Sequence, residues 1–372
     1  MRTWDFAFRF AAKSRRVDKS DARANRELGM WTRERLIELG PTFVKLGQLA
    51  STRRDLYSRE FINELVILQD SVPPMEPWEV DAVLSDELGG KVDDIFADFD
   101  RDPFKSASLG QVHKGKLHSG VDVVVKLQRI GVMESISRDV DNVTDILKFF
   151  EFVGVDTGPK SIELFEEARG YLMEELDYVN EAKNAKTFYQ NFYNTPWVRI
   201  PRVYTKVLTP RLMIMERVDG VKVVDVADPD MRVKVSRALV TNFVEQIMYY
   251  GFFHGDPHPG NVALTSENQL VLYDFGLCVK IDLDLRNGLI ELAPSIIQKD
   301  TPAVVEGLVG LGLIQPTADV TEIVVFIDAA LEYLEEMSGK EFNAKLARDE
   351  LSKGLAEDKP FLIPSDFLFL AK

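Results

Sequence analysis

The sequence predicts an α+β fold in which an all-helical N-terminal extension precedes a small β-rich lobe and a larger helical lobe. Apolar residues recur at helical spacing through roughly the first hundred residues, alternate with polar residues between 109 and 127, and return to helical spacing from 131 onward. With 372 residues the chain can form two or three packed units. We therefore expect the extension at residues 1–100, the small lobe with inserted helices at 101–218, and the large lobe at 219–372.

The helical extension is indicated by regular apolar spacing over residues 23–69, which Gly40-Pro41 interrupts. Proline fits the first turn of a helix, so Pro41 should begin a second helix. Further helices are expected near residues 60–68 and 78–88. Before them, aromatic residues alternate with smaller ones and basic residues follow: Trp4, Phe6, Phe8, Phe10, Lys13, Arg15 and Arg16. This segment could lie at a membrane surface or pack as a helix edge on the protein.

The β-rich lobe begins with two runs typical of strands, residues 109–117 and 121–127, joined by a Gly-containing turn that indicates a hairpin. Alternation places Gln111 and His113 on one face of the first strand, and Val124 and Lys126 on one face of the second. Helices are then expected at residues 131–150, 161–193 and 229–250. Short strands are expected at 202–207 and 211–216.

A group of polar residues between 254 and 276 has the spacing of a phosphoryl-transfer site. Asp256, Asn261 five residues later, and Asp274 of an Asp-Phe-Gly turn match the order in which kinase-like sites place these types. Asn261 and Asp274 would hold Mg²⁺ through oxygen atoms, and Asp256 would orient the attacking hydroxyl or water. The alternative is a metal site of His254, Asp256 and His258, although such sites need three or four ligands.

The nucleotide-binding side is predicted from one lysine and an acidic segment. Lys126 ends a β-run, as kinases place the lysine that contacts the α and β phosphates. Residues 174–181 contain four acids on one predicted helix, where Asp177 and Glu181 stack on one face and either could reach Lys126. Glu175 points elsewhere. A solvated acidic face remains the alternative.

The expected phosphate loop differs from that of ordinary protein kinases. Residues 105–111 read Lys-Ser-Ala-Ser-Leu-Gly-Gln, where a Gly-rich loop would normally stand. The Cβ atoms of Ala107 and Ser108 limit the close backbone approach that glycine allows. This loop should therefore hold nucleotide differently.

Composition excludes several classes of function. The net charge is −15, from 45 Lys and Arg against 60 Asp and Glu, so nucleic acid is not an expected partner. Cys278 is the only cysteine, which excludes a disulfide framework and a cysteine-based zinc site. No apolar run reaches the roughly 18 residues of a membrane-spanning helix.

Taken together, the motifs resemble the UbiB family of atypical kinases, also called aarF-domain-containing kinases. Lys45-Leu46-Gly47-Gln48 is similar to the family's Lys-x-Gly-Gln signature, residues 105–108 stand where the family has an alanine-rich loop, and Glu175-Leu176-Asp177 matches its Glu-x-Asp motif. The catalytic loop and metal turn complete the set, and the resemblance runs from about Phe6 to the end of the chain. It implies a protein-kinase-like bilobal fold.

The resemblance also implies residue roles. The helix with Lys45 and Gln48 would fold over the active site with Lys45 near Glu175, and Glu181 would pair with Lys126. Glu216 and Val218 would lie at the adenine hinge. Ala107 and Ser108 would contact ATP, although Lys105-Ser106 departs from the family's two alanines and leaves nucleotide selectivity open.

The implied activity is Mg-ATP binding and hydrolysis coupled to isoprenoid-quinone or other membrane-lipid metabolism, without implying protein phosphorylation. A membrane lipid or prenyl-quinone would be the partner, with peripheral membrane association. A plastid is favoured over a mitochondrion or a bacterial cytoplasm. The chain stops at residues 367–372, within a segment that family members continue, so we expect a fragment.

Two other functions remain open at this point. One is a small-molecule phosphotransferase of the aminoglycoside or choline kinase type, which uses the same His-Gly-Asp and Asn spacing but does not account for the Lys-x-Gly-Gln segment. The other is a non-catalytic nucleotide-binding scaffold that handles lipids.

Overall fold

The computed structural model describes residues 2–18, 21–51, 57–70, 74–154, 161–257, 259–314, 323–325 and 327–328. The chain forms two compact units. The first comprises Met1–Gln190, Pro201–Val218 and Phe275–Leu277, and the second comprises Asn191–Ile200, Asp219–Asp274 and Cys278–Lys372. Each unit has its own sheets and helices.

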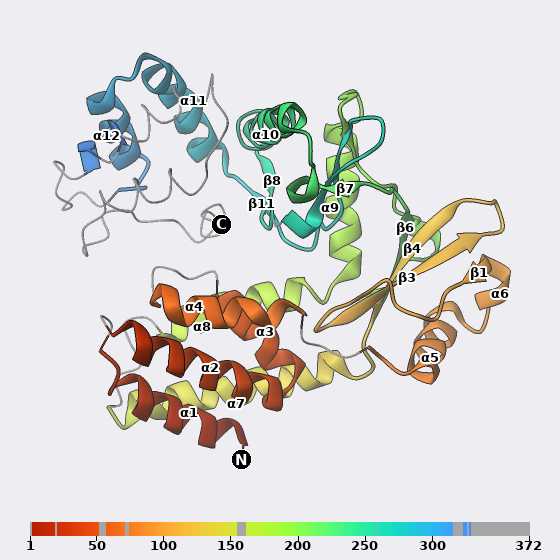
Figure 1. The fold of residues 1–372 in the computed structure, drawn as a ribbon, viewed down its shortest axis with the longest axis horizontal. Coiled ribbons are helices and arrows are strands. Elements are labelled where there is room, and N and C mark those ends of the chain that lie inside the picture. Colours follow the sequence, from red (N-terminus) through yellow and green to blue (C-terminus); the bar gives the residue numbers. More distant parts are fainter. Residues whose placement is uncertain are drawn as a thin grey trace. The chain divides into compact units, whose positions relative to one another are not determined.

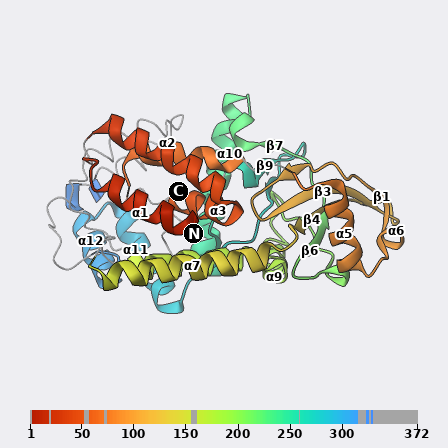
Figure 2. The same ribbon diagram turned by 90° about the horizontal axis from the view of Figure 1, so that it is seen from below.

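Helices make up most of the first unit. They are α1 (Arg2–Ser14), α2 (Ala22–Leu39), α3 (Pro41–Ala50), α4 (Arg59–Val66) with the 3-10 turn η1 (Ile67–Asp70), α5 (Pro77–Leu88), α6 (Val92–Ile95), α7 (Val132–Phe152), α8 (Ser161–Glu174) and α9 (Tyr178–Asn191). Figures 1 and 2 show α1, α2 and α7 running side by side. Gly40 has a φ of 111° between α2 and α3, and Pro41 begins α3, so the predicted break is confirmed.

Aromatic residues of α1 pack inside the unit. Phe6 stacks on Trp31 with ring centroids 5.7 Å apart, while Phe8 meets the edge of Phe150 at 5.0 Å. Trp4 and Phe10 also meet rings of the unit, so the helix-edge interpretation accounts for all four aromatic residues, although Phe8 remains 47% exposed. In the described part of the chain, no helix combines the length and the apolar character needed to cross a bilayer.

The small sheet of the first unit lies between two helices. Its strands are β1 (Phe96–Phe99), β2 (Lys105–Ser106), β3 (Gly110–Leu117), β4 (Asp122–Gln128) and β6 (Leu212–Glu216), in the order β1-β3-β4-β6 with β2 paired to β3. Residues Val123, Val125 and Leu127 of β4 pack with α5, whereas Val124 lies with α9 residues on the other face. Because side chains alternate along a strand, Lys126 falls on the α9 face.

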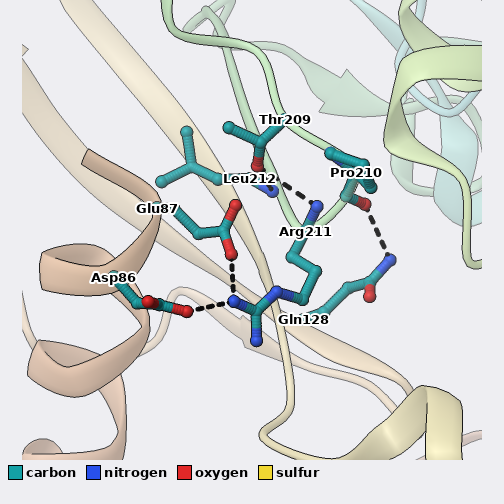
Figure 3. A network of polar contacts seen from close by, with 7 residues as sticks. All are labelled: Asp86, Glu87, Gln128, Thr209, Pro210, Arg211 and Leu212. Carbon is teal, nitrogen blue, oxygen red and sulfur yellow. Dashed lines mark hydrogen bonds and ion pairs between the residues drawn. The ribbon is translucent and has the colours of Figure 1, made fainter. Parts of the chain in front are cut away.

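Arg211 at the start of β6 fixes α5 to the sheet. Its guanidinium pairs with the carboxylates of Asp86 and Glu87 at the C-terminal end of α5 (Figure 3). Thr209 Oγ1 accepts hydrogen bonds from the backbone N–H groups of Arg211 and Leu212, at 3.2 and 3.0 Å. The turn before β6 is thus held together with the helix that covers the sheet.

The second unit combines short strands with helices. Its strands are β5 (Val198–Arg199), β7 (Val221–Lys222), β8 (Phe252–His254), β9 (Val262–Leu264), β10 (Leu270–Leu272) and β11 (Cys278–Lys280), in sheets of order β5-β10-β9-β7 and β11-β8. Its helices are α10 (Pro229–Val244), a π-helical turn η4 (Glu245–Tyr250), the 3-10 turn η5 (Pro259–Asn261), α11 (Leu283–Gln298) and α12 (Thr301–Gly310). The 3-10 turn η3 (Val223–Asp225) follows β7.

Two expectations about local structure are wrong. The helix expected at residues 161–193 is two helices, α8 and α9, separated at residues 175–177. The strand expected at 202–207 is a single bridge at Val203 followed by the 3-10 turn η2 (Thr205–Val207). Helical structure in the extension continues to Ile95, and Phe96–Phe99 then pairs with β3. The segment 367–372 lies outside the described residues.

Candidate active site

Lys126 and Glu181 form the most buried ion pair that involves the predicted residues. Lys126 projects from β4 toward α9, and Glu181 lies in the first turn of that helix. The Lys126 ammonium contacts Oε1 of Glu181, and their side chains are only 13% and 5% exposed. The same Oε1 accepts a hydrogen bond from the backbone N–H of Phe275 at 3.3 Å. One carboxylate thus joins the strand lysine to the Asp-Phe-Gly turn.

Asn184 binds the other side of the Phe275 peptide. Its Nδ2 donates to the Phe275 carbonyl at 2.9 Å, and the fully buried Phe275 ring packs against Phe188 at 5.1 Å. Glu181 and Asn184 are three residues apart and therefore share a face of α9. Sequence reasoning missed Asn184, and the i, i+3 spacing from Glu181 is the signal that could have found it.

Asp177 has a different place from the one expected. It begins α9 and accepts hydrogen bonds from the N–H groups of Val179 at 2.9 Å and Asn180 at 3.1 Å. This is the geometry of an N-cap, which satisfies amides that have no partner within the helix. The Asp177 carboxylate therefore caps α9, and the contact with Lys126 belongs to Glu181.

The Lys-x-Gly-Gln segment packs within the first unit. The Lys45 ammonium pairs with Glu175, in the break between α8 and α9, and Gln48 Nε2 donates to the Leu68 carbonyl at 3.0 Å. A Cβ at Gly47 would lie 2.5 Å from a methyl of Leu68 and 2.7 Å from one of Leu36. The glycine therefore permits close packing of α3, while Lys45 and Gln48 bind separate partners.

The predicted phosphate loop is a tight connection between β2 and β3. The Ala107 N–H donates to the Gly110 carbonyl at 2.9 Å, so the chain reverses within four residues. A Cβ at Gly110 would lie 2.5 Å from the Leu127 carbonyl oxygen, which makes glycine necessary here. Ala107 is exposed whereas Ser108 is buried.

The predicted hinge follows β6. Glu216 is the last residue of this strand, and its N–H donates to the Arg202 carbonyl at 2.8 Å while its carboxylate accepts from the Arg202 N–H at 3.2 Å. Val218 is half-buried at the end of this segment of the first unit. The role of both residues at an adenine site stays a prediction.

The predicted catalytic loop lies in the second unit and is organised by a buried histidine. The N–H of His254 donates to Gln246 Oε1 at 2.8 Å, and the N–H of Asp256 donates to Nδ1 of His254 at 3.1 Å. His254 is 1% exposed, whereas Asp256 is half-buried. Since Nδ1 accepts a hydrogen bond, the imidazole carries its proton on Nε2 when neutral. His254 therefore orients the backbone that carries Asp256.

Asn261 and Asp274 lie at the same end of a hairpin in the second unit. Strands β9 and β10 pair antiparallel with Val262 opposite Leu272, and the Tyr273 N–H donates to the Asn261 carbonyl at 3.0 Å. Asp274 follows directly. Asn261 Nδ2 donates to the carbonyl of Asp256 at 3.4 Å, so the Asn261 side chain contacts the catalytic loop. Burial raises the pKa of Tyr273, with a smaller contribution from Asp219.

The alternative metal site of His254, Asp256 and His258 stays a prediction. Among the residues that the structure describes, no group of three or more His, Cys, Asp and Glu side chains could hold a metal ion. Nδ1 of His254 is engaged by a backbone N–H. His258 lies outside the described residues.

Comparison with known proteins gives the family. The ABC1 atypical kinase-like domain matches residues 67–308. The chain is 36% identical over 93% of its length to the Arabidopsis thaliana protein ACTIVITY OF BC1 COMPLEX KINASE 7, chloroplastic, of which it covers 50%. It is 34% identical over 93% of its length to the uncharacterized Synechocystis protein sll1770, of which it covers 60%. The chain thus spans about half to three fifths of these relatives.

A solved structure supports the fold. Rv3197 from Mycobacterium tuberculosis, determined in complex with erythromycin, superposes with a TM-score of 0.60 at 23% identity, with 80% of each chain covered. The kinase-like α+β fold with N-terminal helices is therefore confirmed. So is the resemblance based on the motifs: the chain belongs to the ABC1 atypical kinase-like family.

Proposed function

We propose that this chain binds Mg-ATP and acts as an atypical kinase or ATPase in isoprenoid-quinone or membrane-lipid metabolism of a plastid. The observation that carries the proposal is the Glu181 carboxylate, which binds both the Lys126 ammonium and the backbone of the Asp-Phe-Gly turn. A lysine held by a buried glutamate is the arrangement that orients the α and β phosphates in kinase-like sites. Family membership gives the same reaction class.

The donor set in the second unit fits magnesium. Asn261 and Asp274 offer one amide and one carboxylate oxygen at neighbouring positions of the hairpin. Mg²⁺ is usually held by one or two carboxylates together with substrate phosphates and water, and this pair supplies one carboxylate and one amide oxygen for it. When bound, the ion would neutralise negative charge on the phosphates.

Asp256 is assigned to orienting the attacking oxygen, and Lys126 to holding the nucleotide phosphates. The half-buried carboxylate of Asp256 is accessible to a water or a small acceptor, and His254 fixes its backbone. The proposed partner is a prenyl-quinone or another membrane lipid. Plastid location is supported by the chloroplastic Arabidopsis relative.

The decisive test is Asp274→Asn in the purified protein. We expect the variant to lose Mg-dependent ATP turnover, because an amide replaces the charged oxygen ligand. Turnover of Mg-ATP at the parent's rate would refute the assignment. Extraction of lipids after affinity purification tests the partner, and a co-purifying prenyl-quinone is the expected result.

A nucleotide-binding scaffold without turnover is the second candidate, and the Lys45–Glu175 ion pair favours it. This pair holds α3 to the α8–α9 break and could keep the protein in one closed arrangement. If ATP raises the melting temperature while hydrolysis stays at background with anionic liposomes present, the scaffold function is correct. Hydrolysis above background under the same conditions supports the enzyme.

A further inference from the structure

Ser106 begins the predicted phosphate loop's connection to β3, and its hydroxyl makes contacts that an alanine could not make. Arg129 Nη2 donates to Ser106 Oγ at 3.0 Å, and Gln111 Nε2 lies 3.5 Å from the same oxygen. Ser106 is the last residue of β2, and its backbone pairs with Gln111 of β3. Ser106 is therefore part of a polar network.

Arg129 also binds the backbone of the loop. Its Nε and Nη2 both donate to the carbonyl of Ala107, at 3.2 and 3.1 Å, and its own N–H donates to the Leu109 carbonyl at 3.0 Å. Arginine suits this task because its planar guanidinium presents several donors in a fixed fork. The guanidinium thus spans the segment expected to contact the phosphates.

Behind the loop, the network ends on buried residues. Gln111 is 1% exposed, and its Oε1 lies 3.2 Å from Nε2 of His113, which is fully buried and bound through Nδ1 to the Asp100 carbonyl at 3.0 Å. Ser106 is therefore anchored on one side by a buried residue and on the other by Arg129. Residues fixed in this way lose little further freedom when a ligand binds.

We propose that Ser106 and Arg129 form a clamp that orders the nucleotide loop in advance of binding and thereby sets its affinity for the nucleotide. This inference rests on the proposed function, because it assigns the loop to a nucleoside triphosphate. Ser106 and Arg129 are positioning residues: they hold the backbone of Ala107 rather than contact the reacting atoms. In this chain the clamp compensates for the absence of a Gly-rich loop.

The first test measures the loop without nucleotide. In Ser106→Ala and Arg129→Lys, hydrogen exchange of a peptide covering residues 105–110 should become about tenfold faster, because the loop opens more often. Ser106→Thr retains the hydroxyl and should exchange like the parent. Ser119→Ala, at an exposed serine of the β3–β4 turn, is the matched control and should leave this peptide unchanged. Parent-like exchange in both clamp variants would overturn the inference.

The second test measures Mg-ATP affinity by calorimetry. Each clamp variant should raise Kd about tenfold, which corresponds to about 1.4 kcal/mol. The double variant should be no weaker than either one, because the two residues act as a unit. A hundredfold loss in the double variant would show independent effects and contradict the clamp. If the parent itself fails to bind Mg-ATP, the proposed function is refuted, while hydrogen exchange still decides whether the clamp exists.

Discussion

Removing one member of the Lys126–Glu181 pair should destabilise the protein more than removing both charges. The two side chains are 13% and 5% exposed, so neither charge can recover full hydration when its partner is lost. Loss of one partner of a buried pair costs about 3–5 kcal/mol. We therefore expect Lys126→Met to lower the free energy of unfolding by about 3 kcal/mol or more, and Glu181→Gln by a similar amount.

The double variant Lys126→Met/Glu181→Gln leaves no uncompensated charge and retains an acceptor for the Phe275 N–H. Its cost should be about 1 kcal/mol, so the coupling energy between the two sites should exceed about 3 kcal/mol. Urea denaturation of the full chain measures all three values. Arg101→Met is the control: it breaks an ion pair whose side chains are 54% and 50% exposed, and solvent screening limits its effect to below about 1 kcal/mol. If the costs of the two single variants add up to the cost of the double variant to within about 0.5 kcal/mol, the reasoning is refuted.

Three further predictions concern single residues. Asn184→Ala removes the hydrogen bond to the Phe275 carbonyl and should lower ATP turnover about tenfold with little change in the Kd of Mg-ATP; an unchanged kcat would contradict it. Asp177→Ala should cost about 1 kcal/mol in urea denaturation through loss of the N-cap of α9, whereas Asp177→Asn should cost much less because asparagine caps equally well. Burial lowers the pKa of His113 below 6.5, against smaller opposing effects of the Asp100 carbonyl and the Asp100 and Asp102 charges. Since the unfolded chain binds the proton more readily, this residue should reduce stability as the pH falls below 6.5. Between pH 7.5 and 5.5 the melting temperature of the parent should therefore fall more than that of His113→Gln.

Breaks between helices and the β-hairpin could be predicted from the sequence, whereas contacts between distant segments could not. Gly40-Pro41 marked the α2–α3 break because both residues have strong backbone preferences. The β3–β4 hairpin was predicted to within one or two residues because two runs of β-forming residues flank a turn that contains Gly120. The break before α9 was missed because it contains no glycine or proline. Its only local signal is the N-capping Asp177, and the residues around it are all compatible with one continuous helix.

The candidate site was predicted where residue type alone restricts the chemistry, and was missed where neutral polar residues position the backbone. A lysine at a strand end and a glutamate on a helix could be matched by charge. Asn184 and Arg129 bind backbone carbonyl oxygens. Every residue offers the same carbonyl group, whatever its side chain. Such contacts depend on tertiary placement, and among these two residues only Asn184 has a local signal, its i, i+3 spacing from Glu181.

The packing of β4 explains why substitutions in the loop, rather than at Lys126, can change nucleotide affinity without disturbing the fold. Val123, Val125 and Leu127 are fully buried against α5, which the Arg211 ion pairs hold to the sheet, so the backbone of Lys126 is fixed from the opposite face. In the loop, Ala107 has no such cover: it is exposed, and its carbonyl is bound by Arg129. Changes in nucleotide affinity that preserve the fold should therefore concentrate in the loop and its clamp.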